Sequence, residues 1–309
     1  MNRILLTLAL TLALILPLSG LAQERPARDL PMDASLLLRQ DLAYHFSLLQ
    51  LDSADGQRHY QLWIGQPNRP APAAGYPALW MLDGNAAVSS LSAEQLEQLA
   101  NGRAPVLIAV GYRSDQRFNR SGRTYDYTPR LPGLEQQIDP LTGMPSGGVE
   151  HFLELLTRHM RPLVAARAPL DPTQQTLWGH SYGGLAVLQA LFTRPTEFTT
   201  YAAASPSLWW HDGAITREAA QLPQRLGDHR ASLVLMRGGS EPSHLGGSSK
   251  GDVEGPARQL AAQLRQVPGL QVSFKRFDNL QHGPMLPASL DWLMETLYGE
   301  KDASLPVAR

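Results

Sequence analysis

The sequence predicts an α/β fold in which a mostly parallel central sheet, opened by an antiparallel hairpin, carries helices on both faces. Three observations lead to this prediction: two strand-like segments joined by a short turn near the amino terminus, short apolar runs after them, and helical patterns between those runs. Strands that alternate with helices favour parallel pairing, because each helix returns the chain to the start of the next strand. Short apolar runs of this kind indicate strands that are covered on both faces.

The hairpin is predicted from two segments, 42–51 and 57–65, that flank the turn-forming sequence Asp-Ser-Ala-Asp-Gly. Later strands are predicted at 76–82, 105–111, 176–179, 200–205, 231–237 and 270–277. Helices are predicted between them at 93–101, 149–168, 182–193, 253–266 and 287–298. Two stretches, 112–148 and 238–252, have the composition of long loops, which in compact domains are usually functional or disordered.

The first 22 residues have the pattern of a secretory signal peptide. Arg3 supplies a positive charge, Ile4–Leu18 is almost wholly apolar, and small residues lead to a cleavage site after Ala22. The alternative is an anchor that stays uncut, although the apolar run is shorter than a typical membrane-spanning helix. Export of a chain without cysteine favours a bacterial periplasm, and we expect residues 23–309 to form a single domain.

Composition excludes several classes of function. The formal net charge of −1 over 309 residues provides no general basic surface, so nucleic acid is not an expected partner. The absence of cysteine excludes disulfides, thiolate metal sites and a thiol nucleophile. We expect neither a metal nor another cofactor, and no later segment is apolar enough to cross a membrane.

A Gly-x-Ser-x-Gly motif at 179–183 places Ser181 between a predicted strand and an apolar helix. This context is typical of the α/β-hydrolase fold, in which glycines allow a sharp turn that lifts the serine hydroxyl out of the sheet. A second match, centred on Ser249, lies in a Gly/Ser-rich loop without either flanking element. We therefore predict that Ser181 is the nucleophile of a serine hydrolase and that Ser249 has no catalytic role.

A serine hydroxyl needs a base to take its proton, and in this fold the chain order is serine, acid, histidine. Four histidines follow Ser181, and His282 lies between the last predicted strand and the last predicted helix, where this fold places its base. Glu241 directly follows an apolar strand and is the expected orienting acid. Asp212 and Asp278 remain alternatives for that role.

Acyl transfer also needs hydrogen-bond donors for the negative charge that develops on the carbonyl oxygen. In this fold one donor is the amide after the nucleophile, here that of Tyr182, and the second comes from the loop after the third strand. That loop has the sequence Met-Leu-Asp-Gly-Asn at 81–85. We expect the amides near Gly84 and Asn85 to supply the second donor, and Asp83 to brace the turn.

Four segments carry a family resemblance: Trp-Met-Leu-Asp-Gly-Asn-Ala at 80–86, Val-Gly-Tyr at 110–112, Arg-Thr-Tyr-Asp-Tyr-Thr-Pro at 123–129 and His-Ser-Tyr-Gly-Gly at 180–184. Together they resemble the periplasmic trilactone-siderophore esterases of the esterase-D-like α/β hydrolases, over nearly all of the mature chain. The resemblance implies an enzyme that opens the trilactone of ferric enterobactin and related tris-catecholates for iron release. It implies Ser181 and His282 as nucleophile and base. Some relatives resemble enzymes with a serine–histidine dyad and no clear acid, which leaves the role of Glu241 as the orienting acid open.

An arginine cluster supports an anionic ligand independently of the resemblance. Five arginines lie between positions 113 and 130, against two aspartates, in a nearly neutral chain. Such a cluster fits a siderophore or its ferric complex, which carries several negative charges, and arginine also stacks on aromatic rings such as catechols. The expected substrate contacts are Arg113, Arg120, Arg123, Tyr125 and Trp209.

Two other functions remain open on the sequence alone. One is an esterase or thioesterase of the same family with a different acyl ester, such as a feruloyl ester, which predicts a neutral pocket. The other is a protein of this fold that binds the ferric ligand without cleaving it. The intact Ser181, His282 and oxyanion loop argue against the second.

Overall fold

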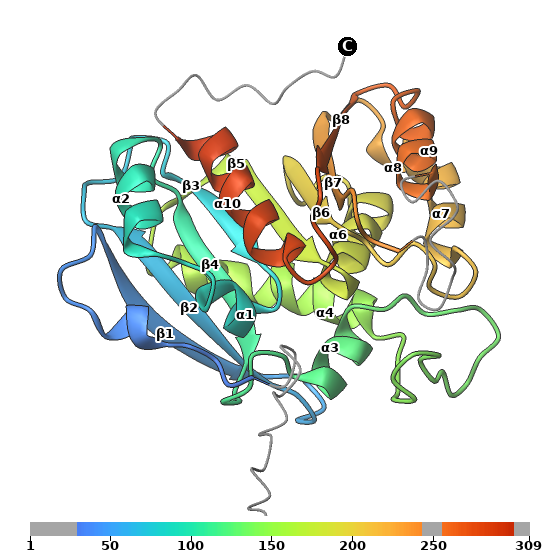
Figure 1. The fold of residues 1–309 in the computed structure, drawn as a ribbon, viewed down its shortest axis with the longest axis horizontal. Helices are drawn as coiled ribbons and strands as arrows, with labels where there is room; N and C mark the ends of the chain where they lie inside the picture. The colour runs from blue at the N-terminus through green and yellow to red at the C-terminus, as the bar shows by residue number, and fades with distance from the viewer. Residues whose placement is uncertain (1–29, 243–254, 300–309) are drawn as a thin grey trace, which may run out of the picture.

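The computed structural model describes residues 30–242 and 255–299 and contains an eight-stranded sheet in the order β1-β2-β4-β3-β5-β6-β7-β8 (Figure 1). The strands are β1 (Tyr44–Asp52), β2 (His59–Pro67), β3 (Tyr76–Met81), β4 (Val106–Tyr112), β5 (Leu170–His180), β6 (Thr200–Ala204), β7 (Ala231–Gly238) and β8 (Leu270–Phe277). β2 pairs antiparallel with both β1 and β4, and all pairs among β3 to β8 are parallel. The predicted mostly parallel sheet with an antiparallel hairpin is confirmed.

Helices cover both faces of this sheet, each over its own apolar core. One core packs α1 (Gly84–Val88), α2 (Ala93–Asn101) and α10 (Met285–Tyr298) against the sheet. The opposite core packs α4 (Val149–Leu155), α6 (Tyr182–Thr193), α7 (Ala214–Glu218), α8 (Leu222–Leu226) and α9 (Gly255–Leu264). Neighbouring residues of one strand pack into different cores, as Leu79 and Trp80 of β3 do, because successive side chains point to opposite faces of the sheet.

Helix α6 is enclosed by protein near the sheet centre. All of its residues from Tyr182 to Phe192 are buried, and it packs against β5 and β6. A helix that is apolar on all sides must be surrounded by protein, which agrees with the apolar helix predicted at 182–193. Its position fixes the turn that precedes it, where Ser181 lies.

Some local predictions were wrong. The stretch 112–148, expected as a loop, contains α3 (Arg120–Asp126), whose sequence has no apolar periodicity and whose amino end is capped by the Asn119 side chain. The helix expected at 149–168 is divided into α4, a π-helical turn at Leu156–Met160 and α5 (Arg161–Ala165). Pro162 has no N–H, so the regular hydrogen-bond ladder cannot pass through it.

Two features of the sequence lie outside the described residues: the expected signal peptide at 1–22 and the second motif centred on Ser249. Within residues 30–242 and 255–299, no helix combines the length and apolarity needed to cross a bilayer.

Candidate active site

The parallel strands deliver the candidate catalytic residues to one edge of the sheet. Asp83 follows β3, Ser181 follows β5, Ser205 follows β6, Glu241 follows β7 and His282 follows β8. Since the carboxyl ends of parallel strands lie at the same edge, residues far apart in sequence meet there.

Ser181 occupies a strained turn between β5 and α6. Its backbone has φ 60° and ψ −116°, a conformation that residues other than glycine rarely adopt. A Cβ at Gly179 would lie 2.5 Å from the backbone of Gly183, and one at Gly184 would lie 2.9 Å from the carbonyl oxygen of Ala204. Gly179 of the motif and Gly184 just after it are therefore needed so that the turn can pack this closely and present the serine hydroxyl.

Ser181, His282 and Glu241 form a continuous hydrogen-bonded chain. Oγ of Ser181 lies 3.0 Å from Nε2 of His282, and Nδ1 of His282 lies 2.7 Å from Oε2 of Glu241. When Nδ1 carries the proton and donates it to the carboxylate, Nε2 is free to accept the serine proton. The geometry is that of a nucleophile, a general base and an orienting acid.

Glu241 is buried, and its other carboxylate oxygen is also occupied. Oε1 accepts hydrogen bonds from Oγ of Ser205 at 2.5 Å and from the amide of Gly238 at 2.7 Å. Burial would raise the pKa of Glu241, but the hydrogen bond from His282, the nearby Arg237 guanidinium and the Ser205 hydroxyl outweigh it and hold this pKa below its usual value. The carboxylate therefore stays charged opposite His282.

The alternative acids lie elsewhere. Asp278 is exposed and pairs with Arg276, with Nη1 and Oδ1 2.5 Å apart. Asp212 is also exposed and, together with Trp209, lines a hollow of about 570 Å³ between the loop after β6 and α9. Among the described residues, it is the carboxylate of Glu241 that accepts the hydrogen bond from Nδ1 of His282.

His180 holds the backbone of the candidate base. Its ring is buried, and Nε2–H donates to the carbonyl oxygen of His282 at 2.9 Å. The two imidazole rings lie 4.6 Å apart. Burial, together with the neighbouring His282 and Arg123, lowers the pKa of His180 well below its usual value, so this ring remains neutral beside the base.

The expected oxyanion donors lie at the starts of two helices. Gly84 and Asn85 begin α1, and Tyr182 begins α6, so their amides have no acceptor within their own helices. The two turns are adjacent: the amide of Leu82 donates to the carbonyl of Trp178 in β5 at 3.0 Å. Backbone donors from two adjacent turns thus lie at the edge of the sheet that carries Ser181, and their role as an oxyanion hole stays a prediction.

The Asn85 side chain has a separate role in the structure. Its Nδ2 donates to the carbonyl oxygens of Tyr112, Ser114 and Gln116, and its Oδ1 accepts the amide of Tyr112. Four hydrogen bonds therefore tie the chain after β4 to the start of α1, and any contribution of Asn85 to the oxyanion hole must come from its backbone.

The expected ligand-binding arginines differ in their surroundings. Arg113 pairs with Asp52, and Arg123 forms a bidentate pair with Asp83, which leaves its side chain 16% exposed. Arg120 is exposed, and within the described part of the chain no hydrogen bond or ion pair engages it. Two of the three expected positive charges are thus already matched by carboxylates.

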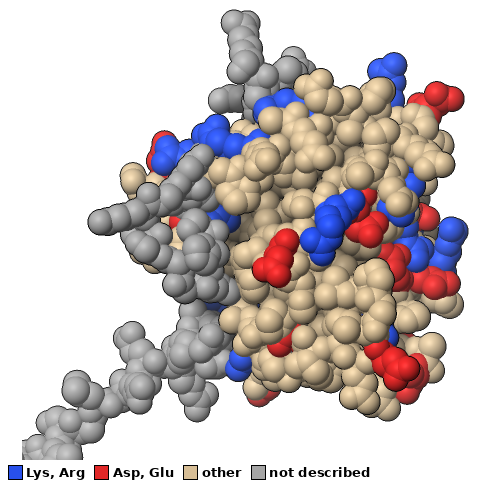
Figure 2. Space-filling model, turned by 90° about the vertical axis from the view of Figure 1, so that its right-hand side faces the viewer, with Lys and Arg blue, Asp and Glu red and all other residues tan. Residues whose placement is uncertain are grey.

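Surface charge is correspondingly dispersed on one side of the molecule. Among the described residues visible on the face that Figure 2 presents, basic and acidic side chains are scattered among uncharged ones and form no broad basic patch.

The expected aromatic contacts are also partly committed to the protein. The Tyr125 ring lies under the Arg58 guanidinium, 4.6 Å from its centroid, and against Gly148. Trp209 is half-buried, with its ring 6.2 Å from that of Tyr182. Trp209 therefore packs near the side chain of the residue that follows Ser181.

Several residues that contact the nucleophile turn were not predicted from the sequence. Oδ2 of Asp139 accepts hydrogen bonds from the Tyr182 hydroxyl and from Nε1 of Trp210, each at 2.8 Å. Oγ of Ser207 lies 3.4 Å from Oγ of Ser181. No local pattern marks these residues, because their partners lie 26 to 71 positions away.

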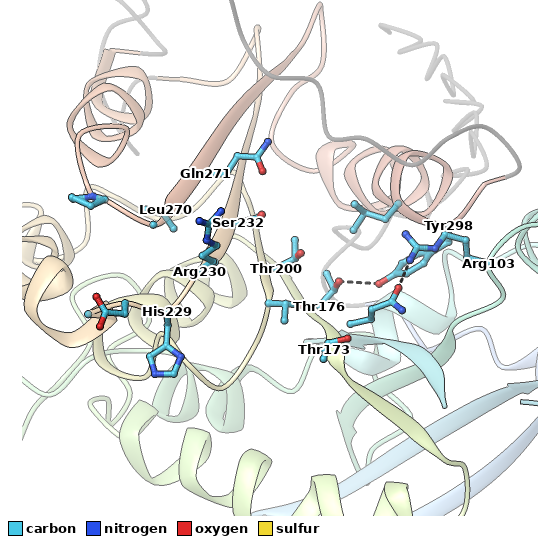
Figure 3. A pocket seen from close by; sticks show the side chains of 18 residues that line it. Arg103, Thr173, Thr176, Thr200, His229, Arg230, Ser232, Leu270, Gln271 and Tyr298 are labelled. Atoms are coloured by element: carbon cyan, nitrogen blue, oxygen red, sulfur yellow. Dashed lines mark hydrogen bonds between the residues drawn. The ribbon is translucent and has the colours of Figure 1, made fainter. Parts of the chain in front are cut away.

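The site is distinct from a cavity of about 1010 Å³ at the other edge of the sheet (Figure 3). Thr200, Ser232 and Leu270, at the starts of β6, β7 and β8, line that cavity together with His229 and Arg230. The catalytic residues follow the opposite ends of these strands. In residues 30–242 and 255–299, no three His, Cys, Asp or Glu side chains converge to hold a metal.

Known proteins similar to this chain share both its sequence and its fold. Residues 53–275 match the Esterase family, described as "Putative esterase". The chain is 35% identical over 274 residues to the apo-salmochelin esterase of Escherichia coli, across 87% of this chain and 84% of that protein. It is 28% identical over 253 residues to the ferri-bacillibactin esterase BesA of Bacillus subtilis, across 77% and 84%.

A solved structure, the enterobactin and salmochelin hydrolase IroE, is similar with a TM-score of 0.67 and 35% sequence identity, over 84% of this chain and 97% of that chain. The predicted α/β-hydrolase architecture is therefore confirmed by a relative of known structure. With a family match over most of its length and a 35% identical relative over 87% of it, this chain belongs to the Esterase family and is a serine esterase.

Proposed function

We propose that this esterase hydrolyses the trilactone ester bonds of a catecholate siderophore, in the periplasm, so that iron bound by the siderophore can be released. The observation that carries the proposal is the similarity, over more than four fifths of both chains, to proteins named for the hydrolysis of salmochelin and enterobactin. The hydrogen-bonded Ser181–His282–Glu241 chain supplies the chemistry that such a substrate needs.

The reaction follows from the geometry. His282 takes the proton of Ser181 as Oγ attacks the ester carbonyl, and the charge on the carbonyl oxygen is met by the amides of Tyr182, Gly84 and Asn85. The ester bond breaks, and the leaving hydroxyl receives the proton from His282. Water, activated by the same histidine, then attacks the acyl-enzyme, which yields a carboxylate and restores the serine. Each cycle opens one ester bond.

Recognition of an anionic ligand is part of the proposal. Arg120 offers a charge that no carboxylate of the described residues matches. The other members of the expected contact set are Arg113, Arg123, Tyr125 and Trp209, of which Arg113 and Arg123 are ion-paired. The names of the relatives include both an apo-siderophore and a ferri-siderophore esterase, so the free and iron-bound forms are both candidate substrates.

A specific observation favours a second candidate, an esterase for a less charged acyl ester. Arg113 and Arg123 are ion-paired, so the local positive charge is smaller than the sequence suggests. This candidate predicts equal efficiency on neutral and anionic esters.

The deciding experiment incubates the protein with enterobactin and with ferric enterobactin and identifies the products by mass. Hydrolysis of the trilactone adds the mass of one water molecule for each ester bond cleaved. The Ser181→Ala variant should give no hydrolysed product. If the wild type leaves both forms intact while it hydrolyses a neutral phenyl ester, the siderophore proposal is wrong and the second candidate stands.

A further inference from the structure

The loop after β6 places two adjacent tryptophans in different surroundings. Trp210 is buried, and its Nε1 donates to Oδ2 of Asp139 at 2.8 Å. Trp209 is half-buried, with its ring 6.2 Å from that of Tyr182, and within the described part of the chain no acceptor engages its Nε1. Trp210 thus anchors the loop in the core, while Trp209 keeps part of its ring and a hydrogen-bond donor available.

The turn that follows these tryptophans is strained. His211, Asp212 and Gly213 have φ 42°, 53° and 74°, so three successive residues occupy the left-handed region that residues other than glycine rarely adopt. The His211 ring packs edge-on against that of Trp210, with their centroids 4.3 Å apart. Strain of this kind persists only where the surrounding contacts hold it, and it is common at ligand-binding sites. The position of Trp209 is therefore fixed by a turn that costs free energy to maintain.

Trp209 lines the hollow of about 570 Å³ between this loop, α7 and α9. Its other lining residues supply mainly apolar and uncharged polar groups, from Leu208, Gly213, Thr216, Pro256, Gln259, Leu260 and Gln263. Asp212 is the charged residue among the described ones that line it, so no cation there favours an anion. An apolar cavity of about 150 Å³ is enough to bind benzene. The hollow therefore has the size and lining for an uncharged aromatic ring with polar substituents.

The hollow begins close to the nucleophile. Leu208 and Trp209 directly follow Ser207, whose Oγ lies 3.4 Å from Oγ of Ser181 and whose amide donates to the Ser181 carbonyl at 3.3 Å. Two residues of chain span at most about 7 Å. Trp209 also lies against Tyr182, the residue after the nucleophile. A ring joined by a few bonds to an ester carbonyl at Ser181 is therefore within reach of Trp209.

We propose that this hollow is a subsite for an uncharged aromatic arm of the ester substrate, with Trp209 as the residue that selects it. The arm is an aroyl group carried on the nitrogen next to the ester that Ser181 cleaves. Its ring stacks on Trp209 and is buried against Leu208 and Leu260, which favours it over a small acyl group. The inference rests on the ester cleavage of the proposed function and adds the class of substituent that the enzyme selects.

The test compares two substrates with the same ester bond, the methyl esters of N-benzoylserine and N-acetylserine. Titration of the acid released gives kcat and KM for each. Full burial of an aromatic ring is worth about ten- to a hundredfold in affinity, so the wild type should prefer the N-benzoyl ester by about that factor in kcat/KM. The preference should appear mainly in KM, because the ring is bound equally in the ground state and the transition state.

Two variants of the hollow should reduce this preference. Trp209→Ala removes the stacking surface, and its loss of kcat/KM on the N-benzoyl ester should exceed its loss on the N-acetyl ester by at least about tenfold. Gln263→Trp places a large ring in the hollow from the exposed face of α9 and should reduce the preference by a similar factor.

Matched controls separate the subsite from general effects on stability. Ala262→Trp adds the same side chain about 100° around α9, at an exposed position that does not line the hollow. Trp292→Ala removes another half-buried tryptophan, whose ring lies 6.1 Å from that of Phe277 in an arrangement like that of Trp209 and Tyr182. Both variants should keep the wild-type preference for the N-benzoyl ester, even where the melting temperature falls.

Three results would overturn the proposal: a wild type that cleaves both esters equally well, a preference that survives both Trp209→Ala and Gln263→Trp, and controls that lose it as fully as these variants. If Trp209→Ala fails to fold, Gln263→Trp decides, since it changes an exposed helix position. Neither ester contains a catechol or iron. A normal N-benzoyl preference with intact enterobactin would contradict the proposed function alone, and hydrolysed enterobactin without that preference would contradict this inference alone.

Discussion

Oε2 of Glu241 lies 2.7 Å from Nδ1 of His282, although 41 residues separate them in the sequence. The contact exists because β7 and β8 are parallel neighbours, so the loops that follow them emerge side by side. Glu241 is buried and its pKa is held low, and it therefore presents a charged oxygen to the imidazole. This pair decides which nitrogen of His282 faces Ser181.

Glu241→Ala should reduce kcat on the order of ten-thousandfold, as expected for loss of a triad acid that fixes the histidine tautomer. Steady-state kinetics on a neutral ester measures the effect. Asp278→Ala is a suitable control, because that carboxylate is exposed and pairs with Arg276, and it should leave kcat unchanged. A loss below tenfold for Glu241→Ala would indicate a serine–histidine dyad.

Ser181→Ala should abolish ester hydrolysis while leaving ligand affinity nearly unchanged, since the hydroxyl acts mainly in bond making. Product mass reports cleavage, and quenching of intrinsic fluorescence by the ferric ligand reports binding. Ser249→Ala should behave like the wild type. Persistent cleavage at the wild-type rate by Ser181→Ala would mean that another residue is the nucleophile.

Binding of an anionic siderophore should weaken as salt rises, whereas hydrolysis of a neutral ester should barely change. The Debye length is about 8 Å at physiological ionic strength, so added salt screens an exposed charge such as Arg120. Arg120→Ala should therefore raise KM for the ferric siderophore and reduce its salt dependence. The measurement is KM for both substrates over a series of salt concentrations. If KM changes equally with salt for the charged and the neutral substrate, Arg120 does not contact the ligand.

Folding stability should depend on pH through Asp126. Burial raises the pKa of Asp126 to about 7, against the opposing effect of the Tyr60 and Tyr112 hydroxyls and Arg58. The unfolded chain releases this proton near pH 4 and the folded protein only near pH 7. The folded state thus holds more protons in this window, and the stability that Asp126 contributes is complete below about pH 4 and is lost as pH rises toward 7.

Asp126→Asn should remove this part of the pH dependence. One pKa unit corresponds to about 1.4 kcal/mol, and 1 kcal/mol to roughly 2–4 °C in melting temperature for a protein of this size. Between pH 4 and 7 the melting temperature of the wild type should therefore fall by several degrees relative to the variant. If the melting temperatures of the two proteins change equally with pH across this range, the raised pKa of Asp126 does not control stability.

The elements with a strong local signal could be predicted from sequence. The predicted strands at 76–82, 105–111 and 270–277 agree with β3, β4 and β8 to within a residue, because a run of apolar residues between turns has few other ways to be buried. Helix α3 could not be predicted, since its stability comes from Asn119 at its cap and from ion pairs with Asp83 and other distant residues.

The nucleophile and base could be proposed from the sequence for a related reason. Ser181 has a glycine pattern that only a tight strand-to-helix turn requires, and His282 has the right place in the chain order of the fold. Arg123 is the contrasting case. We expected it to face a ligand, and its guanidinium is paired with Asp83, 40 positions earlier in the chain.

The sequence by itself determined the α/β architecture, the serine hydrolase chemistry and the family resemblance, because local periodicity, glycine spacing and residue order encode them. Only the tertiary structure decided which charges are already matched, which hydroxyls hold a buried carboxylate, and how Arg123, Asp83 and Tyr182 come together. The physical reason is that ion pairs and hydrogen bonds act over a few ångströms in space, and the distance between two residues in space follows from strand order rather than from their separation along the chain.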